Sequence, residues 1–241
     1  MPLFVLKLQQ RRVLKLQQRR GAFAVVFVGS TDHETWACVR SSSSDDAAGT
    51  HGRWSEAASH FTSFMDMGSL LGATERSLLA GDELYFTAKD CRRILKYNLK
   101  RHRLSVITLP AALNMESMVL ITMEGGNGKQ QLGIAGVKEC SLHLWSQQPS
   151  CDANVSTTWT RRKAIDLLTM LPVSVVETWR MRMMPRPRFS VVAFAEGADT
   201  VFISTDAGLF TFELKSGLFK KVFKRTMDAT IFPYVGFLHS R

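Results

Sequence analysis

The sequence predicts an all-β protein built from repeated four-stranded antiparallel sheets. The first observation behind this prediction is the run Leu209–Leu214, in which Phe210, Phe212 and Leu214 share one face. Alternation with a period of two indicates a strand that buries one face better than the other. Turns rich in glycine and polar residues flank the run, so we expect it to pair with its neighbours in a meander.

The second observation is that the same order of elements recurs along the chain. Each unit has an apolar strand, a polar turn, an alternating strand, a basic or glycine-containing turn and a third strand, and the clearest units have a further apolar strand in front. A repeated meander of roughly 40–50 residues is typical of a β-propeller blade. The middle strands of the four units centre on Cys38, Tyr97, Leu144 and Phe212.

The first two units lie in the amino-terminal half of the chain. The first is the weaker, because a basic segment stands where its opening strand is expected. The second is regular, and its middle strand places Leu95, Tyr97 and Leu99 on one face. The expected strands are Ala22–Val28, Thr35–Arg40 and Arg53–Ala57 in the first unit, and Ser77–Ala80, Glu83–Phe86, Ile94–Leu99 and Leu104–Leu109 in the second.

The last two units fill the carboxyl-terminal half. The polar loop Gln147–Thr158 delays the closing strand of the third unit. The sequence GGNGK at Gly125–Lys129 lacks the spacing of a phosphate-binding loop, so we interpret it as a hairpin turn. The expected strands are Ser117–Met123, the hairpin Gln131–Ser146 and Trp159–Leu167 in the third unit, and Ser190–Ala195, Val201–Ile203, Leu209–Leu214 and Leu218–Phe223 in the fourth.

Burial explains why such units assemble. A single four-stranded sheet cannot bury both of its faces, whereas sheets stacked around an axis bury them against one another and protect their edges. The prediction is therefore a β-propeller-like domain over 21–241 with about four blades, as a partial or truncated relative of a larger propeller. Without tryptophan-aspartate or Gly-His pairs, the sequence does not indicate a WD40 propeller.

The basic character of the chain is concentrated at its amino terminus. The net charge is +10, and six basic residues and no acid fall within the first 20 residues. The octapeptide VLKLQQRR occupies residues 5–12 and recurs unchanged at 13–20. Eight residues is not close to a whole number of helical turns, so the repeat does not indicate a helix. We expect residues 1–20 to form a disordered arm; a transit peptide and a nucleic-acid or membrane contact are the alternatives.

Cysteine usage and hydropathy bound the location of the protein. Cys38, Cys91, Cys140 and Cys151 are scattered and form no CxxC pair, which favours reduced thiols in a cytoplasmic or nuclear protein. Organellar targeting by the basic arm is the alternative. No apolar stretch approaches the roughly 18 residues of a membrane-spanning helix, so no membrane partner is expected.

Several stretches of the chain carry a family resemblance: ILKYNLKRHRLSVITLP, LHLWSQ with WTRRKAIDLLTMLP, VVAFAEGADTVFISTDAGLFTFELKSGLFKKVF, and the closing PYVGF. They are similar to plant F-box proteins of the large grass set, whose carboxyl-terminal half is an F-box-associated β-propeller. The resemblance covers roughly Ala22–Gly236. In that family the F-box binds the Skp1 adaptor of a ubiquitin ligase and the propeller presents the target protein.

The resemblance implies a non-catalytic protein-interaction module with a protein target. The chain shows no F-box pattern, so Skp1 binding is not expected. The sequence points to no cofactor, metal or catalytic residue: its six histidines show no HExxH spacing, and no GxSxG elbow is present. The alternative is a propeller enzyme, a hydrolase or sugar-acting enzyme with its site at the central channel. Against it, the expected inner strands Ser77–Ala80, Ser117–Met123 and Ser190–Ala195 carry no charged residue.

One segment stands out as a candidate partner-binding surface, the sequence ETWRMRMMPRPRF at Glu177–Phe189. Arginine, tryptophan and methionine are enriched in protein interfaces, and methionine adapts to irregular partners. An acidic protein partner fits this composition. RNA binding is the less favoured alternative, and a flexible insertion between blades is the other. The candidate residues are Trp179, Arg180, Arg182, Arg186 and Arg188.

Overall fold

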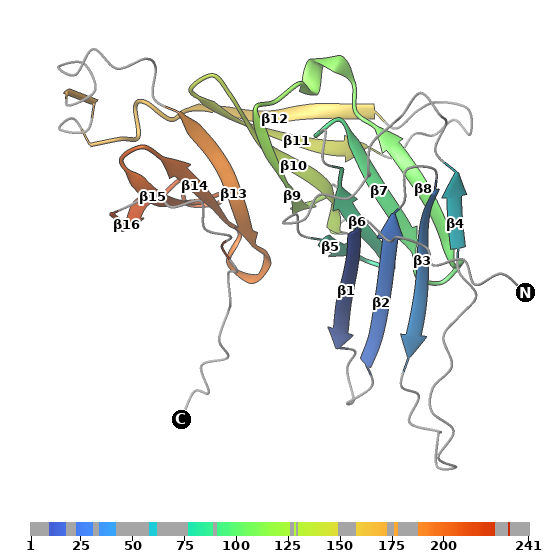
Figure 1. Ribbon diagram of the computed structural model, residues 1–241. Coiled ribbons are helices and arrows are strands. Elements are labelled where there is room, and N and C mark those ends of the chain that lie inside the picture. Colours follow the sequence, from blue (N-terminus) through green and yellow to red (C-terminus); the bar gives the residue numbers. More distant parts are fainter. Residues whose placement is uncertain are drawn as a thin grey trace, which may run out of the picture. The chain divides into compact units, whose positions relative to one another are not determined.

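The computed structural model describes residues 10–17, 23–30, 34–41, 58–61, 77–88, 91–125, 128, 130–148, 158–172, 176–177, 188–224 and 231. Within these residues the chain forms sixteen β-strands, arranged as four antiparallel sheets of four strands each (Figure 1). In every sheet the strands follow one another in chain order. This confirms the predicted all-β, propeller-like fold of four meanders. No helix in the described part of the chain is long and apolar enough to cross a membrane.

The chain divides into two compact units, residues 1–109 and 110–241. The boundaries predicted from sequence, an arm over 1–20 and one domain over 21–241, differ from this division. Each unit contains two sheets. The first unit has β1 (Gln10–Gln17), β2 (Phe23–Ser30), β3 (Glu34–Ser41) and β4 (Ala58–Phe61) in one sheet, and β5 (Ser77–Ala80), β6 (Glu83–Thr87), β7 (Arg93–Asn98) and β8 (Arg103–Thr108) in the other.

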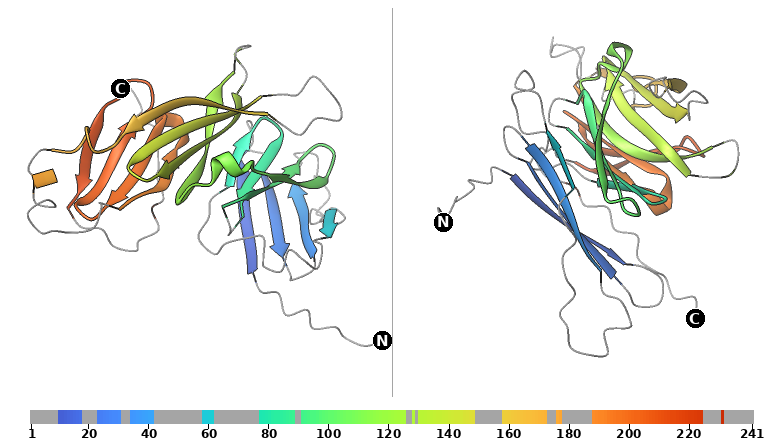
Figure 2. Two further views of the ribbon diagram at one scale, coloured as in Figure 1. Left: turned by 90° about the horizontal axis from the view of Figure 1, so that it is seen from above. Right: turned by 90° about the vertical axis from the view of Figure 1, so that its right-hand side faces the viewer.

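In the second unit the two sheets lie side by side (Figure 2). Their first strands are in contact, and the backbone N–H of Val191 donates a hydrogen bond to Ser117 Oγ across the seam (2.9 Å). The strands are β9 (Ser117–Glu124), β10 (Gln130–Lys138), β11 (Ser141–Gln148) and β12 (Thr158–Asp166), then β13 (Phe189–Ala195), β14 (Thr200–Thr205), β15 (Gly208–Glu213) and β16 (Phe219–Phe223), with the 3-10 helices η1 (Ala111–Leu113) and η2 (Glu196–Ala198).

The first sheet differs from its prediction at both ends. Residues 10–17, expected within a disordered arm, form strand β1, which pairs with β2 along its whole length from Gln10↔Ser30 to Gln17↔Phe23. The expectation of disorder is therefore wrong for these eight residues. The predicted strand Arg53–Ala57 lies outside the described residues, and the structure places the fourth strand, β4, directly after it.

Each unit has its own hydrophobic core between its two sheets. In the first unit Val26 and Val28 of β2 pack with Phe86, Leu95 and Tyr97 of the neighbouring sheet. In the second unit the buried residues of β11 pack against the buried residues of β14 and β15 in the other sheet. Burying such side chains against a second sheet is the dominant stabilising term. The second core contains Leu142, Leu144, Ile165, Val191, Val201, Ile203, Phe210 and Phe212, among others.

The β5–β8 sheet also holds a polar cluster around Glu83. The hydroxyl of Tyr85, a buried residue, donates to Glu83 Oε2 (2.5 Å), Asn98 Nδ2 donates to Oε1 (3.3 Å), and Lys96 Nζ lies 3.0 Å from Oε1. Burial alone would raise the pKa of Glu83, but the hydrogen bonds from Tyr85, Lys96 and Asn98 and the Lys96 charge outweigh it and hold the pKa below its usual value. The cluster therefore stabilises the ionised carboxylate.

Replacing Phe210 with alanine should lower the free energy of unfolding by about 3–5 kcal/mol, because its ring is 1% exposed in the second core. Phe223→Ala is the matched control in the same sheet. That ring is 59% exposed, so its removal should change stability by no more than about 0.5 kcal/mol. Urea unfolding followed by circular dichroism measures both. Equal losses for the two variants would contradict the assigned core.

Tyr85→Phe should cost about 1 kcal/mol at neutral pH, because it removes one hydrogen bond from a partly solvated carboxylate. A lowered native pKa gives stability that is present above the unfolded pKa and lost as pH falls through the native pKa. The difference between wild type and variant should therefore shrink as the pH drops below 4.5, the ordinary value for Glu83. Urea unfolding between pH 3 and 7 measures it. In a Glu83→Gln background the effect of Tyr85→Phe should no longer vary over this range, and persistent variation there would count against the assignment.

Candidate functional site

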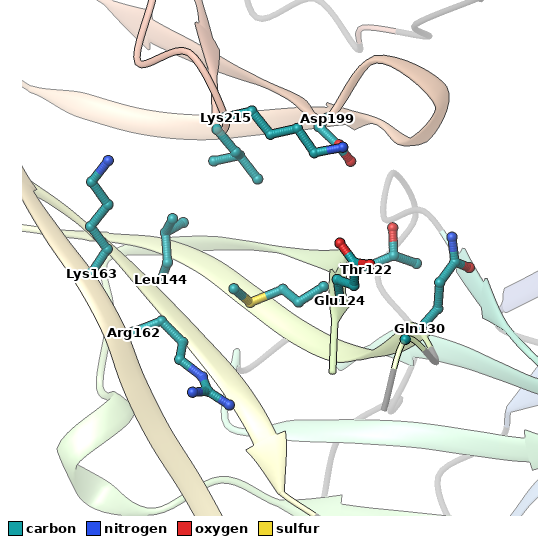
Figure 3. Close-up of a pocket in the computed structure, with 11 residues that line it drawn as sticks. Thr122, Glu124, Gln130, Leu144, Arg162, Lys163, Asp199 and Lys215 are labelled. Carbon is teal, nitrogen blue, oxygen red and sulfur yellow. The ribbon is translucent and has the colours of Figure 1, made fainter. Parts of the chain in front are cut away.

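A pocket of about 470 Å³ lies between the two sheets of the second unit (Figure 3). The β9–β12 sheet supplies the end of β9, the start of β10 and the middle of β11 and β12. The β13–β16 sheet supplies the residue before β14 and the two residues after β15. The lining residues are Thr122, Met123, Glu124, Gly128, Gln130, Leu144, Arg162, Lys163, Asp199, Leu214 and Lys215.

The turn between β9 and β10 borders the pocket. The last pair of this hairpin is Glu124↔Gln130, and the N–H of Gly128 donates to the carbonyl of Gly125 (3.0 Å). Gly128 has a φ of 70°, which a glycine adopts without strain. The structure thus confirms that the glycine-rich segment is a hairpin turn. It also extends β9 by one residue beyond its predicted end, so that the inner strand carries the carboxylate of Glu124.

Met123 lies on the floor of the pocket because a glycine leaves room beside it. A Cβ at Gly133 of β10 would lie 2.6 Å from Met123 Cγ and 2.8 Å from its Sδ, closer than real contacts allow. A glycine inside a strand commonly marks such a close approach. Together with Leu144 and Leu214, Met123 gives the pocket an apolar surface.

Two cations line the pocket at a β-bulge in β12. In the ladder between β11 and β12, Leu144 pairs with Lys163 and Trp145 pairs with Arg161, so Arg162 has no partner in the register. An extra residue in one strand interrupts the alternation of side chains and redirects them locally. The consecutive residues Arg162 and Lys163 both line the pocket beside this bulge.

The guanidinium of Arg162 is held by a buried hydroxyl. Its Nε donates to Ser146 Oγ at 2.6 Å, and Ser146 is fully buried. This bond uses one of the five guanidinium N–H groups and leaves the terminal nitrogens for other acceptors. Neither Arg162 nor Lys163 has a carboxylate within ion-pair distance among the described residues.

The opposite wall carries an ion pair. Asp199 follows η2 with a φ of 46°, a left-handed conformation that aspartate tolerates better than most residues. Lys215 Nζ lies 2.7 Å from Asp199 Oδ2. The hydrogen bond to Asp199 and its negative charge raise the pKa of Lys215, and the more distant charge of Glu124 adds to this. Figure 3 shows this pair on the wall facing Glu124 and Gln130.

The predicted partner-binding surface falls mostly outside the described residues. Trp179, Arg180, Arg182 and Arg186 lie there. Arg188 is described: it is exposed and directly precedes β13. Arg188 does not line the pocket.

His143 lies on the face of β11 opposite Leu142 and Leu144, because burial alternates along this strand. Its pKa is lowered by burial and by the nearby charges of Arg161 and Lys138. Among the described residues no group of three His, Cys, Asp or Glu side chains could hold a metal ion. Sequence reasoning missed the pocket; the basic run in β12 and Gly133 in β10 are the signals that could have indicated it.

Gly133→Ala should lower the free energy of unfolding by about 1–3 kcal/mol, because the new Cβ forces Met123 out of its position. Met123→Ala in the same chain removes the clash. The cost of the double variant should therefore be smaller than the sum of the two single costs, as measured by urea unfolding in a double-mutant cycle. Additive costs would show that the two positions do not interact.

Comparison with known proteins places this geometry in a family. The family model for "F-box protein AT5G49610-like, beta-propeller" matches residues 7–237. No curated protein gives a significant match. Two solved structures that the search matches are candidate 6-phosphogluconolactonases, from Bacteroides uniformis (TM-score 0.40, 14% identity) and Bacteroides fragilis (TM-score 0.39, 12% identity). The alignments cover 89% of this chain, which spans 56% of the length of each of those proteins.

The family model covers nearly the whole chain, including the residues that form β1, and its β-propeller description agrees with the four meanders. The chain belongs to the family of F-box protein AT5G49610-like β-propellers.

Proposed function

We propose that the chain is a non-catalytic recognition module that holds the target protein of an SCF-type ubiquitin ligase. The observation that carries the proposal is the match to the propeller of F-box proteins over residues 7–237. An F-box joins a ligase adaptor, so the propeller of such a protein is the part left to contact the target. Within each unit, the packing of two sheets against one another supplies a scaffold of the kind that recognition requires.

The pocket of the second unit supports this role. It combines an apolar surface at Met123, Leu144 and Leu214 with cationic groups at Arg162 and Lys163. Recognition sites have this composition: apolar contacts with a few placed polar groups that fix orientation. The proposal includes a cytoplasmic or nuclear location, where ubiquitin ligases of this type act on their targets.

The experiment has two steps. The tagged chain is cross-linked in plant extract, captured partners are identified, and each is then produced in pure form for a direct affinity measurement. We expect at least one purified partner to bind with a dissociation constant in the micromolar range or tighter. We also expect no binding of purified Skp1, because the sequence shows no F-box pattern.

The ligase role is tested by fusing an F-box, which the sequence does not show, to this chain. An F-box fused ahead of residue 1 should direct ubiquitination of the purified partner in a reconstituted reaction, whereas the F-box alone should not. Failure of every purified partner to bind would refute the recognition role. Binding without ubiquitination by the fusion would refute the ligase role, and tight binding of Skp1 to the unfused chain would refute the absence of a docking module.

A further inference from the structure

We propose that the pocket between the two sheets of the second unit binds an acidic peptide segment, one in which a carboxylate side chain neighbours an apolar side chain. This inference rests on the proposed recognition function and names the chemistry that the site accepts. Its supporting observations are the charge balance of the pocket, the fixed position of Arg162 and the apolar floor.

The pocket is lined by three cations, Arg162, Lys163 and Lys215, and two carboxylates, Glu124 and Asp199, so its net charge is +1. Asp199 is paired with Lys215 at 2.7 Å, so these two largely cancel. Glu124 lies on the side of this pair, and its charge contributes to the raised pKa of Lys215. Arg162 and Lys163 on the β12 side have no carboxylate within ion-pair distance in the described part of the chain. An incoming anion is therefore attracted to Arg162 and Lys163 on the β12 side of the pocket.

The position of Arg162 is fixed before a ligand arrives. Its Nε bond to the fully buried Ser146 restricts the side chain, so less conformational entropy is lost on binding than for a free surface arginine. The planar guanidinium suits a carboxylate, with which it can form paired hydrogen bonds. Lys163, next in sequence and paired with Leu144, adds a second donor on the same pocket.

The apolar floor and the size of the pocket define the rest of the ligand. Leu144 is 4% exposed and belongs to the core, and Leu214 packs against that core. A volume of about 470 Å³ accommodates a few side chains rather than a folded domain. Thr122 and Gln130 supply neutral polar groups that can bond to a peptide backbone. An acidic residue next to a leucine or similar residue satisfies all three features.

The probe is a fluorescein-labelled peptide of three Gly-Leu-Glu repeats, compared with the Gly-Leu-Gln peptide of equal length. Fluorescence anisotropy at low salt should show at least about tenfold tighter binding of the acidic peptide. In the double variant Arg162→Gln/Lys163→Gln the affinity for the acidic peptide should fall by the same factor, at least about tenfold, so that the preference over the amide peptide disappears.

Two controls separate the pocket from general charge effects. Lys220→Gln/Lys221→Gln removes the same charge from the exposed strand β16 of the same unit, outside the pocket, and should leave the affinity unchanged. Because Arg162→Gln also removes the bond to Ser146, single variants at the exposed Lys163 provide an independent series. Affinity for the acidic peptide should fall in the order wild type, Lys163→Gln, Lys163→Glu, with unchanged thermal unfolding.

The inference is overturned if the wild type does not distinguish the two peptides, if the β16 control weakens binding as much as the pocket variant, or if the Lys163 series shows no order. The recognition function fails in a different way. A purified partner that binds the Arg162→Gln/Lys163→Gln chain as tightly as the wild type refutes the pocket but supports the recognition role. If the chain binds the acidic peptide but no purified partner, the peptide site is supported and the recognition role is refuted.

Discussion

The need to bury the apolar face of each four-stranded sheet against a second sheet governs this structure. A meander such as β13–β16 places Val201, Ile203, Phe210 and Phe212 on one face. Exposing that face to water would forfeit most of the hydrophobic free energy that stabilises the fold. The β9–β12 sheet covers it with Leu142 and its neighbours. The hydrogen bond from Val191 to Ser117 Oγ then fixes the first strands of the two sheets at the seam. The position of the pocket follows from how completely the apolar faces of the β9–β12 and β13–β16 sheets are in contact.

The pocket forms where that contact is incomplete. Along the middle of the seam large side chains interdigitate, but toward the β9–β10 turn the supporting residues become small or irregular. Gly133 leaves the space that Met123 occupies, and the bulge at Arg162 interrupts the register of β12. The space between the sheets is lined by the ends of β9, β10 and the β14–β15 hairpin and by exposed residues in the middle of β12, so its charged groups can still reach solvent. A site of this kind combines a rigid apolar floor with charges that need not be fully desolvated.

The strands were predictable from sequence because one-sided burial produces alternation, as in Leu209–Leu214. The strand β1 was missed because the octapeptide repeat was tested against the helical period alone. Eight is a multiple of two, so both copies of VLKLQQRR keep the same alternation and are compatible with a strand. The pocket could not be derived in this way. Its bulge exists only in the register between β11 and β12, and the Asp199–Lys215 pair depends on how two turns close around the β14–β15 hairpin.

The outer strands of the second unit show how a binding site could arise from edge protection. Both β12 and β16 are edge strands, and both carry adjacent cations and a bulge: Arg162 is the unpaired residue in β12, and Val222 is the unpaired residue in β16. Charged side chains and bulges are the usual means of keeping an edge strand from pairing with another chain. The two edges therefore share a cause, but only β12 has an apolar floor and a facing wall beside its cations. Edge charge alone accounts only for discouraging strand pairing; the combination with Leu144 and Met123 is what distinguishes the β12 edge and supports the proposed peptide site.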